Sequence, residues 1–194
     1  MGFIAVSIFV VMVPFSFIDQ HISEEVQERN SSLLYNVMYT ISWFGNIPVS
    51  LIMVFLTALL FFVFRFKREA VYILITLSSG IISSIVKYIV NRPRPAKNLV
   101  KVLEHARQQS FPSGHVLFYT VFFGLIIIIM SQIQIIPKGL KIIVNIISCL
   151  MIFFVPVSRI YLGAHWFTDV LGGFILGIIC LFILAHFYLK KFTM

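Results

Sequence analysis

Charged side chains are scarce in this chain: lysine, arginine, aspartate and glutamate make up 11% of its 194 residues, and only seven residues are acidic. Hydrophobic residues make up 60% of the sequence, and the mean hydropathy is +1.01. This composition excludes an ordinary soluble protein and indicates an integral membrane protein. Several membrane spans leave almost no chain for a separate soluble region, so we predict a single domain over residues 1–194.

Cysteine is also scarce, and the excess of positive charge is dispersed along the chain. Cys149 and Cys180 both lie inside apolar runs, where they are most simply small packing residues and say nothing about the redox compartment. The net charge is +8, but the basic residues lie in short segments between apolar runs rather than in one basic domain. This distribution favours anionic membrane lipids over nucleic acid as partners.

The long apolar runs predict an all-α, polytopic membrane protein with six transmembrane helices and short interfacial helices. Residues 19–44 and 96–110 place apolar side chains at helical spacing among polar ones, which predicts amphipathic helices at the interface. Gly173 and Gly177 in the last run predict close helix packing. The predicted spans are residues 2–18, 47–64, 69–90, 113–136, 142–157 and 166–189.

Six spans place both termini on one side of the membrane, and the basic residues indicate which side. The raw counts are nearly equal, with seven basic residues on the side of the termini and eight on the other. Lys87, Arg94 and Arg159 are better explained as site residues, and the first loop also carries four acidic residues. With this correction, the positive-inside rule predicts cytoplasmic termini in the plasma membrane, with the third-to-fourth and fifth-to-sixth loops facing outward.

The fifth-to-sixth loop carries the polar residues that are most costly next to a membrane. Arg159, His165 and Asp169 lie between two apolar runs, so a functional role is the default hypothesis. If a helix runs from Trp166, His165 and Asp169 share one face, where the carboxylate can hold Nδ1–H and leave Nε2 free to attack. An isolated pair at this spacing is more often a helix start with a polar cap, so the interpretation depends on two further stretches.

The first of these stretches supplies positive charge on the same predicted membrane face. Lys87 and Arg94 flank the third-to-fourth loop, and with Arg159 they make three cations. Guanidinium groups match phosphate oxygens in a bidentate manner, so this set suits a dianionic ligand. A simpler interpretation, of interfacial bases that extend toward water, is kept for Arg92, Lys97 and Lys101.

The second stretch is Phe-Pro-Ser-Gly-His at residues 111–115, which opens the fourth span. A helix N-terminus presents unpaired backbone N–H groups and the positive end of the helix dipole to an anion. Ser113 can donate to a phosphate oxygen, and Gly114 permits close approach of the backbone. His115 follows at a position within reach of a leaving oxygen.

Together the three stretches resemble the signatures of the type 2 phosphatidic acid phosphatase superfamily. The first signature is a lysine followed seven residues later by Arg-Pro, as in Lys87 and Arg94-Pro95. The second is Pro-Ser-Gly-His, at residues 112–115. The third is Ser-Arg, five residues, His, three residues and Asp, at residues 158–169. The seven-residue spacing in the first signature selects Arg94 rather than Arg92.

This resemblance implies hydrolysis of a lipid phosphomonoester or pyrophosphate without a metal or other cofactor. His165 would form a phosphohistidine, Asp169 would orient it, and His115 would protonate the leaving group and then activate water. A neutral His165 and a cationic His115 would give a bell-shaped pH profile. The phosphate oxygens would be bound by Lys87, Arg94, Ser113, Gly114 and Arg159.

The resemblance leaves the substrate and some alternatives open. Phosphatidylglycerophosphate, phosphatidic acid and undecaprenyl pyrophosphate all fit, and the sequence sets neither the choice among them nor the oligomeric state. A lipid phosphotransferase would pass the phosphoryl group to an alcohol instead of water, and a phospholipid-binding or carrier protein would not react at all. A metal hydrolase is a weaker alternative, because three cations oppose metal binding and no typical spacing occurs among His105, His115, His165, Asp169 and Glu104.

Overall fold

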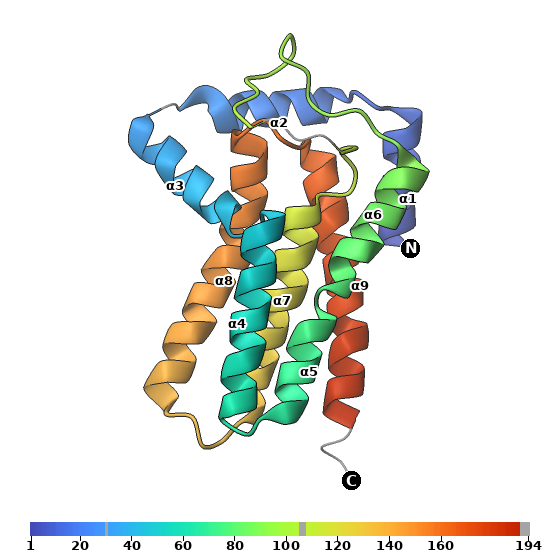
Figure 1. The fold of residues 1–194 in the computed structure, drawn as a ribbon. Coiled ribbons are helices and arrows are strands. Elements are labelled where there is room, and N and C mark those ends of the chain that lie inside the picture. The colour runs from blue at the N-terminus through green and yellow to red at the C-terminus, as the bar shows by residue number, and fades with distance from the viewer. Residues whose placement is uncertain (30, 105–107, 191–194) are drawn as a thin grey trace.

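The computed structural model describes residues 1–29, 31–104 and 108–190, and its regular secondary structure in these ranges is entirely helical (Figure 1). The all-α fold predicted from the apolar runs is therefore confirmed. The helices in chain order are α1 (Gly2–Met12), α2 (Phe17–Glu28), α3 (Ser32–Trp43), α4 (Ile47–Val63), α5 (Lys67–Ile75), α6 (Ser78–Val90), α7 (Gly114–Gln132), α8 (Lys138–Tyr161) and α9 (Phe167–Lys190).

Several of these helices have the length and apolar character of membrane spans. Helices α7, α8 and α9 each qualify, as does the continuous stretch of α5 and α6. The pairs α1–α2 and α3–α4 qualify only when each is taken together, and they are bent by 96° and 60°. The described residues thus hold four candidate spans, or up to six if each bent pair is one span, beside the six that were predicted. Large apolar side chains are exposed along α4 and α8, as expected for helices that face lipid.

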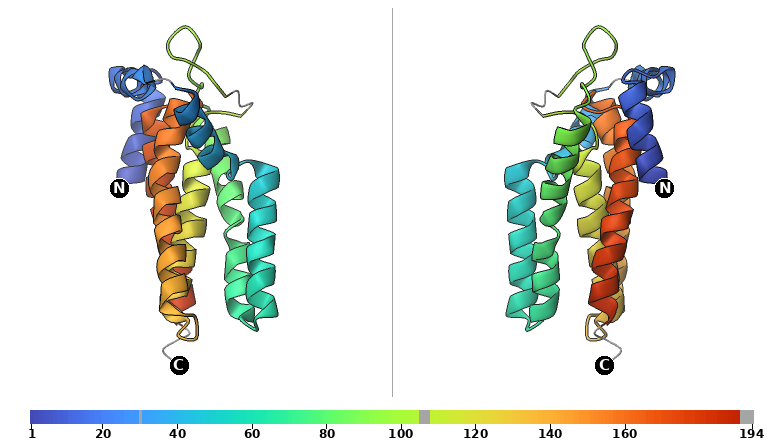
Figure 2. Two further views of the ribbon diagram at one scale, coloured as in Figure 1. Left: turned by 90° about the vertical axis from the view of Figure 1, so that its left-hand side faces the viewer. Right: turned by 90° about the vertical axis from the view of Figure 1, so that its right-hand side faces the viewer.

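Helix α7 forms the centre of the bundle. Helices α4, α5 and α6 lie on one side of it, and α8 and α9 lie on the other (Figure 2). A Cβ atom at Gly173 of α9 would lie 2.6 Å from the Ser113 carbonyl oxygen, and one at Gly177 would lie 2.7 Å from the Cβ of Thr120. The close packing predicted for these two glycines is confirmed, and it holds α9 against the N-terminal half of α7.

The prediction of one straight helix over residues 2–18 is wrong. Helix α1 ends at Met12, because Pro14 lacks an N–H group and restricts the residue before it. Ser16 then caps α2, accepting a hydrogen bond from the Asp19 amide at 3.1 Å. The new helix departs at 96° and lies across the end of the bundle (Figure 1).

Helices α2 and α3 are the amphipathic helices predicted within residues 19–44. Ile22 and Val26 of α2 pack on the core of the bundle, while Glu24 and Glu25 are exposed. Met38 of α3 packs in a small cluster with the end of α8. The two helices therefore cover the end of the bundle at which the long loops meet.

The prediction of an interfacial helix over residues 96–110 is wrong for the described part of this segment. After a single turn, its amide groups bond to distant parts of the chain instead of to the preceding turn. The Lys101 amide donates to Gln27 Oε1 at 3.1 Å, and the Leu103 amide donates to the Leu162 carbonyl at 2.9 Å. These partners replace the helical hydrogen bonds, so the described part of the segment is irregular and docks on the bundle end.

Candidate active site

The two loops that were predicted to share a membrane face are in direct contact. The Glu104 amide donates to the Leu162 carbonyl at 3.1 Å, which ties the α6–α7 loop to the α8–α9 loop. Gly163 has a φ of +65°, and a Cβ there would lie 2.1 Å from the Lys101 carbonyl oxygen. Only glycine satisfies both conditions, so this residue permits the close approach of the loops.

His165 and Asp169 face each other at the start of α9. Both are buried, and His165 Nδ1 lies 3.6 Å from Asp169 Oδ2. The same carboxylate oxygen accepts hydrogen bonds from the Trp166 amide at 2.9 Å and from the Ser110 hydroxyl. Asp169 lies in the first turn of α9, where the helix dipole favours its negative charge. The structure therefore places the two side chains together, as the spacing predicted.

The other nitrogen of His165 lies beside Arg94. The Nη1 atom of Arg94 is 3.3 Å from His165 Nε2. A guanidinium group can only donate, so this contact requires an unprotonated Nε2 and puts the imidazole proton on Nδ1, toward Asp169. The pKa of His165 is held well below its ordinary value, first by burial and then by the nearby charges of Arg94, Lys87 and Arg159.

Backbone carbonyl groups of the α6–α7 and α8–α9 loops hold two of the predicted phosphate-binding cations. Lys87 Nζ donates to the Gln109 carbonyl at 2.6 Å and to the Ser110 carbonyl at 3.2 Å. Arg94 Nε donates to the Gln108 carbonyl at 2.5 Å, and Nη1 donates to the Ala164 carbonyl at 2.5 Å. Burial and the charge of Arg159 lower the pKa of Arg94 to about 10, so Arg94 stays charged at neutral pH.

Arg159, the third predicted cation, lies in the last turn of α8 because that helix continues past the predicted end at residue 157. Its side chain is buried, and Nη1 donates to Glu104 Oε2 at 2.7 Å and to the Ser42 hydroxyl. Its Nε atom is also buried and has no hydrogen-bond partner among the described residues. An unsatisfied guanidinium N–H next to the site is a vacant donor for an anion.

The N-terminus of α7 is attached to the turn that carries Asp169. The Ser113 amide donates to the Asp169 carbonyl at 2.9 Å, while the Ser113 hydroxyl is fully buried and lacks a partner within the described chain. A Cβ at Gly114 would lie 3.2 Å from the Ser83 hydroxyl, so the backbone is closely packed at this point. The free amide end of the helix and a vacant hydroxyl can both donate to an anion here.

His115 is half-buried in the first turn of α7, and the α3–α4 corner holds it. Its Nε2 atom is 3.3 Å from Asn46 Oδ1. A Cβ at Gly45 would lie 2.2 Å from the Cδ2 atom of the ring, so the imidazole occupies the space that a side chain would need. Asn46 was not predicted as a site residue; its position at the N-terminus of a long apolar run was the available signal.

The interpretation of Arg92 as an exposed interfacial base is wrong. Its side chain is 1% exposed, and it forms ion pairs with Asp19 at 2.7 Å and with Asp169 at 2.6 Å. The two buried carboxylates compensate the positive charge and accept its N–H groups, which offsets the cost of burying the guanidinium and is the physical reason for the difference. Asp19 and Glu104 were also missed as partners of site arginines; the scarcity of acidic residues was the signal that could have indicated them.

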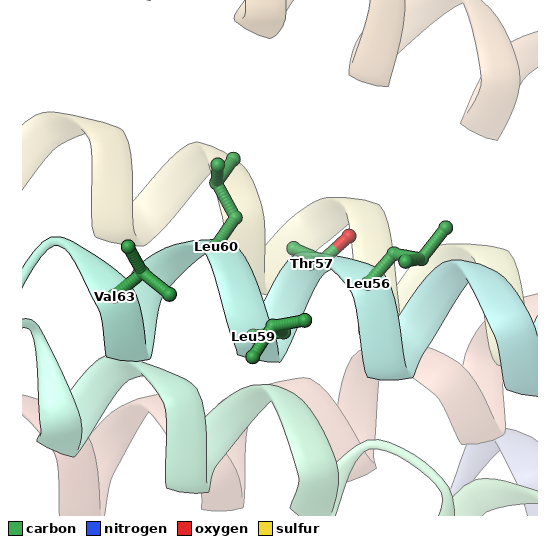
Figure 3. A pocket seen from close by; sticks show the side chains of 5 residues that line it. All are labelled: Leu56, Thr57, Leu59, Leu60 and Val63. Atoms are coloured by element: carbon green, nitrogen blue, oxygen red, sulfur yellow. The ribbon is translucent and has the colours of Figure 1, made fainter.

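We also searched the described residues outside this site for a metal site and for a pocket. Among the described residues, no group of three His, Cys, Asp or Glu side chains is placed to hold a metal ion, and His105 lies outside them. A groove along α4 is lined by one hydroxyl and four aliphatic side chains (Figure 3). The lining residues are Leu56, Thr57, Leu59, Leu60 and Val63.

Two solved structures share the fold of this chain. The crystal structure of a transmembrane PAP2-type phosphatidylglycerolphosphate phosphatase from Bacillus subtilis matches with a TM-score of 0.82 and 24% identity, covering 97% of this chain and 95% of that one. Aquifex aeolicus LpxE matches with a TM-score of 0.69 and 22% identity, covering 89% and 96%. At these identities the two matches show the fold, which is that of a membrane protein.

Sequence comparisons define the family. Phosphatidylglycerophosphatase B of Bacillus subtilis is 28% identical over 171 residues, which cover 87% of this chain and 82% of that protein. Undecaprenyl-diphosphatase of Sulfolobus acidocaldarius is 30% identical over 125 residues, covering 62% of this chain and 56% of that protein. The family model of the PAP2 superfamily matches residues 68–193, a range that includes all three signatures. The chain therefore belongs to the PAP2 superfamily, as the three signatures predicted.

Proposed function

We propose that this protein is a lipid phosphate phosphatase that hydrolyses a phosphomonoester or pyrophosphate through a phosphohistidine on His165, without a metal. The arrangement of His165 carries the proposal. Its Nδ1 lies 3.6 Å from Asp169 Oδ2, and its Nε2 lies 3.3 Å from the Nη1 of Arg94. A buried imidazole between a carboxylate and a guanidinium has the tautomer of a nucleophile and a cation beside the reacting atom.

In the first step, the Nε2 lone pair attacks phosphorus and the bond from phosphorus to the leaving oxygen breaks. His115 gives a proton to that oxygen, which departs as an alcohol or a phosphate. Asp169 compensates the positive charge that develops on the phosphorylated imidazole. Arg94 holds a phosphoryl oxygen beside the N–P bond that forms.

In the second step, water attacks the phosphohistidine. His115, now neutral, accepts a proton from the water as its oxygen bonds to phosphorus, and the N–P bond breaks to release inorganic phosphate and free His165. Lys87 and Arg159, together with Ser113 and the Gly114 amide, bind the remaining oxygens in both steps. The buried unpartnered groups, Arg159 Nε and the Ser113 hydroxyl, support this assignment.

The relatives and the positions of the charges support a choice of lipid substrate and of membrane location. The names of the two curated relatives favour phosphatidylglycerophosphate and undecaprenyl pyrophosphate as substrates, beside phosphatidic acid. The site lies at the bundle end opposite the basic turns near Arg65 and Lys138 (Figure 1). By the positive-inside rule, this supports cytoplasmic turns and a cytoplasmic C-terminus, with the site on the outer face of the plasma membrane, where a lipid enters from the bilayer.

We expect kcat/KM to fall at acid pH, and this fall should begin only below the pH range in which histidine ordinarily titrates. His165 must be unprotonated to attack, and its pKa is depressed first by burial and then by the neighbouring cations. Protonation therefore inactivates the enzyme as the pH falls through a value below 6.5. The measurement is kcat/KM for a lipid phosphate from about pH 4.5 to about pH 8 at constant ionic strength. An acid limb centred above about pH 7 would contradict the neutral-nucleophile assignment.

Phosphate release by the purified protein tests the function directly. We expect inorganic phosphate from at least one of phosphatidic acid, phosphatidylglycerophosphate and undecaprenyl pyrophosphate, with full activity in excess EDTA. An excess of glycerol is included as an alternative acceptor. Phosphate that appears on glycerol rather than free would indicate a phosphotransferase, and lipid that binds but never reacts would indicate a carrier. Loss of activity in EDTA that a divalent metal restores would overturn the metal-independent mechanism.

A further inference from the structure

Arg92 uses every hydrogen-bond donor of its guanidinium group inside the protein. Nη1 donates to Asp169 Oδ1 and to the Thr168 hydroxyl, both at 2.6 Å. Nη2 donates to Asp19 Oδ2 at 2.7 Å and to the Pro14 carbonyl at 2.9 Å, and Nε donates to the same carbonyl at 3.2 Å. With its five N–H groups occupied, Arg92 has none to offer a phosphate. This distinguishes it from Arg159, whose buried Nε has no partner among the described residues.

The partners of Arg92 include both aspartates of the chain, since Asp19 and Asp169 are the only two in the sequence. Both are fully buried. Asp19 also accepts hydrogen bonds from the Thr168 amide at 2.8 Å and from the Thr168 hydroxyl at 2.9 Å. Helix α2 is thereby joined to the first turn of α9, and the joint is next to the carboxylate that faces His165.

The Arg92 contacts fix the two oxygens of Asp169 in different roles. Oδ1 accepts from Arg92, which leaves Oδ2 on the side of His165 Nδ1. The backbone of Arg92 contributes as well, because its carbonyl accepts from the Ser110 amide at 2.9 Å and the Ser110 hydroxyl donates to Oδ2. A buried carboxylate without a counter-ion is strongly disfavoured in its charged form, and arginine supplies a charge that does not titrate.

We propose that Arg92, anchored by Asp19 of α2, is a positioning residue that pairs with the Asp169 carboxylate and keeps it oriented toward His165. The inference rests on the proposed function, in which His165 is the nucleophile. Because Arg92 offers no donor to the substrate, its loss should slow the attack on phosphorus without weakening lipid binding. An arginine that only holds the corner between α1 and α2 together would instead determine how much of the protein is folded.

Single-turnover formation of the phosphoenzyme separates these two roles, because it gives a rate constant and an amplitude. The substrate is the ³²P-labelled lipid that the wild-type protein hydrolyses fastest, and the variants are Arg92→Gln, Arg92→Lys and Asp19→Asn. We expect the rate constant to fall about ten- to a hundredfold in Arg92→Gln, with amplitude and KM close to wild type. Arg92→Lys and Asp19→Asn should fall less, since the first keeps the charge and the second keeps the contact with Asp169.

The control is Arg29→Gln, which removes an exposed arginine at the end of α2 and should leave the rate constant unchanged. If Arg92→Gln does not fold, Arg92→Lys and Asp19→Asn decide the question. A lower amplitude with an unchanged rate constant would reduce Arg92 to a structural role, and a higher KM alone would make it a phosphate ligand; either result overturns the proposal. If the wild-type protein itself forms no phosphoenzyme, the proposed function fails and this inference falls with it.

Discussion

Substitution of His165 by alanine is expected to reduce phosphate release by at least about a thousandfold, because it removes the atom that bonds to phosphorus. Lys87, Arg94 and Arg159 keep their hydrogen-bond partners on other segments, so the variant should still bind the lipid. The measurements are phosphate release under saturating lipid and labelling with ³²P quenched in alkali. The wild-type protein should form an acid-labile, base-stable phosphoenzyme that the variant lacks.

His186→Ala is the matched control for this experiment. It removes an exposed imidazole from the other end of the same helix, α9, and should leave both turnover and phosphoenzyme formation unchanged. If His165→Ala retained a tenth or more of the wild-type rate, about 1.4 kcal/mol or less of barrier would depend on this residue, and His165 could not be the nucleophile.

Substitution of His115 by alanine is expected to have an effect that depends on the leaving group. Alkyl oxygens need a proton to depart, so hydrolysis of phosphatidic acid should fall by about a hundredfold to ten-thousandfold. Nitrophenolate departs without a proton, so p-nitrophenyl phosphate should still phosphorylate His165. The phosphohistidine then lacks the base that activates water and should accumulate. The expected signature is a burst of nitrophenolate equal to the enzyme concentration, followed by slow turnover.

The burst distinguishes general acid–base catalysis from simple damage to the site. His21→Ala serves as the control, because His21 lies on the exposed face of α2 and stacks on Phe17. Equal slowing of both substrates with no burst would mean that His115 positions the phosphate rather than transferring protons. Asn46 is then the next residue to vary, since its Oδ1 lies 3.3 Å from the His115 ring.

Local patterns in the sequence predicted most of the fold because membrane helices satisfy their hydrogen bonds within themselves. Apolar runs therefore correspond closely to helices such as α4 and α9. The prediction failed where the backbone bonds to distant segments. Residues 96–110 have helical periodicity, yet the Lys101 and Leu103 amides bond to Gln27 and to Leu162. No local pattern identifies such partners.

In the candidate site too, residues within local signatures were predicted, and a residue that depends on distant partners was not. Lys87, His115 and His165 were identified from signatures whose spacing is local, and the structure brings these stretches together. Arg92 was assigned to the interface because a single arginine after a helix has no local partner that would suggest burial. Its partner Asp19 is separated from it by 73 residues, and only the packing of α2 over the bundle end joins them.

The contact between Asp19 and Thr168 spans 149 residues, and it bears on how the protein is made. During synthesis, Asp19 leaves the ribosome long before Thr168 exists, and until later segments are made its carboxylate has the neighbouring Ser16 hydroxyl as a donor. Arg92 is made earlier than Thr168 and can shield this charge until the last helix inserts. Insertion of α9 then delivers Thr168, His165 and Asp169 in one event. A nascent chain that stops before α9 consequently has no partial activity, and phosphatase activity marks completed insertion.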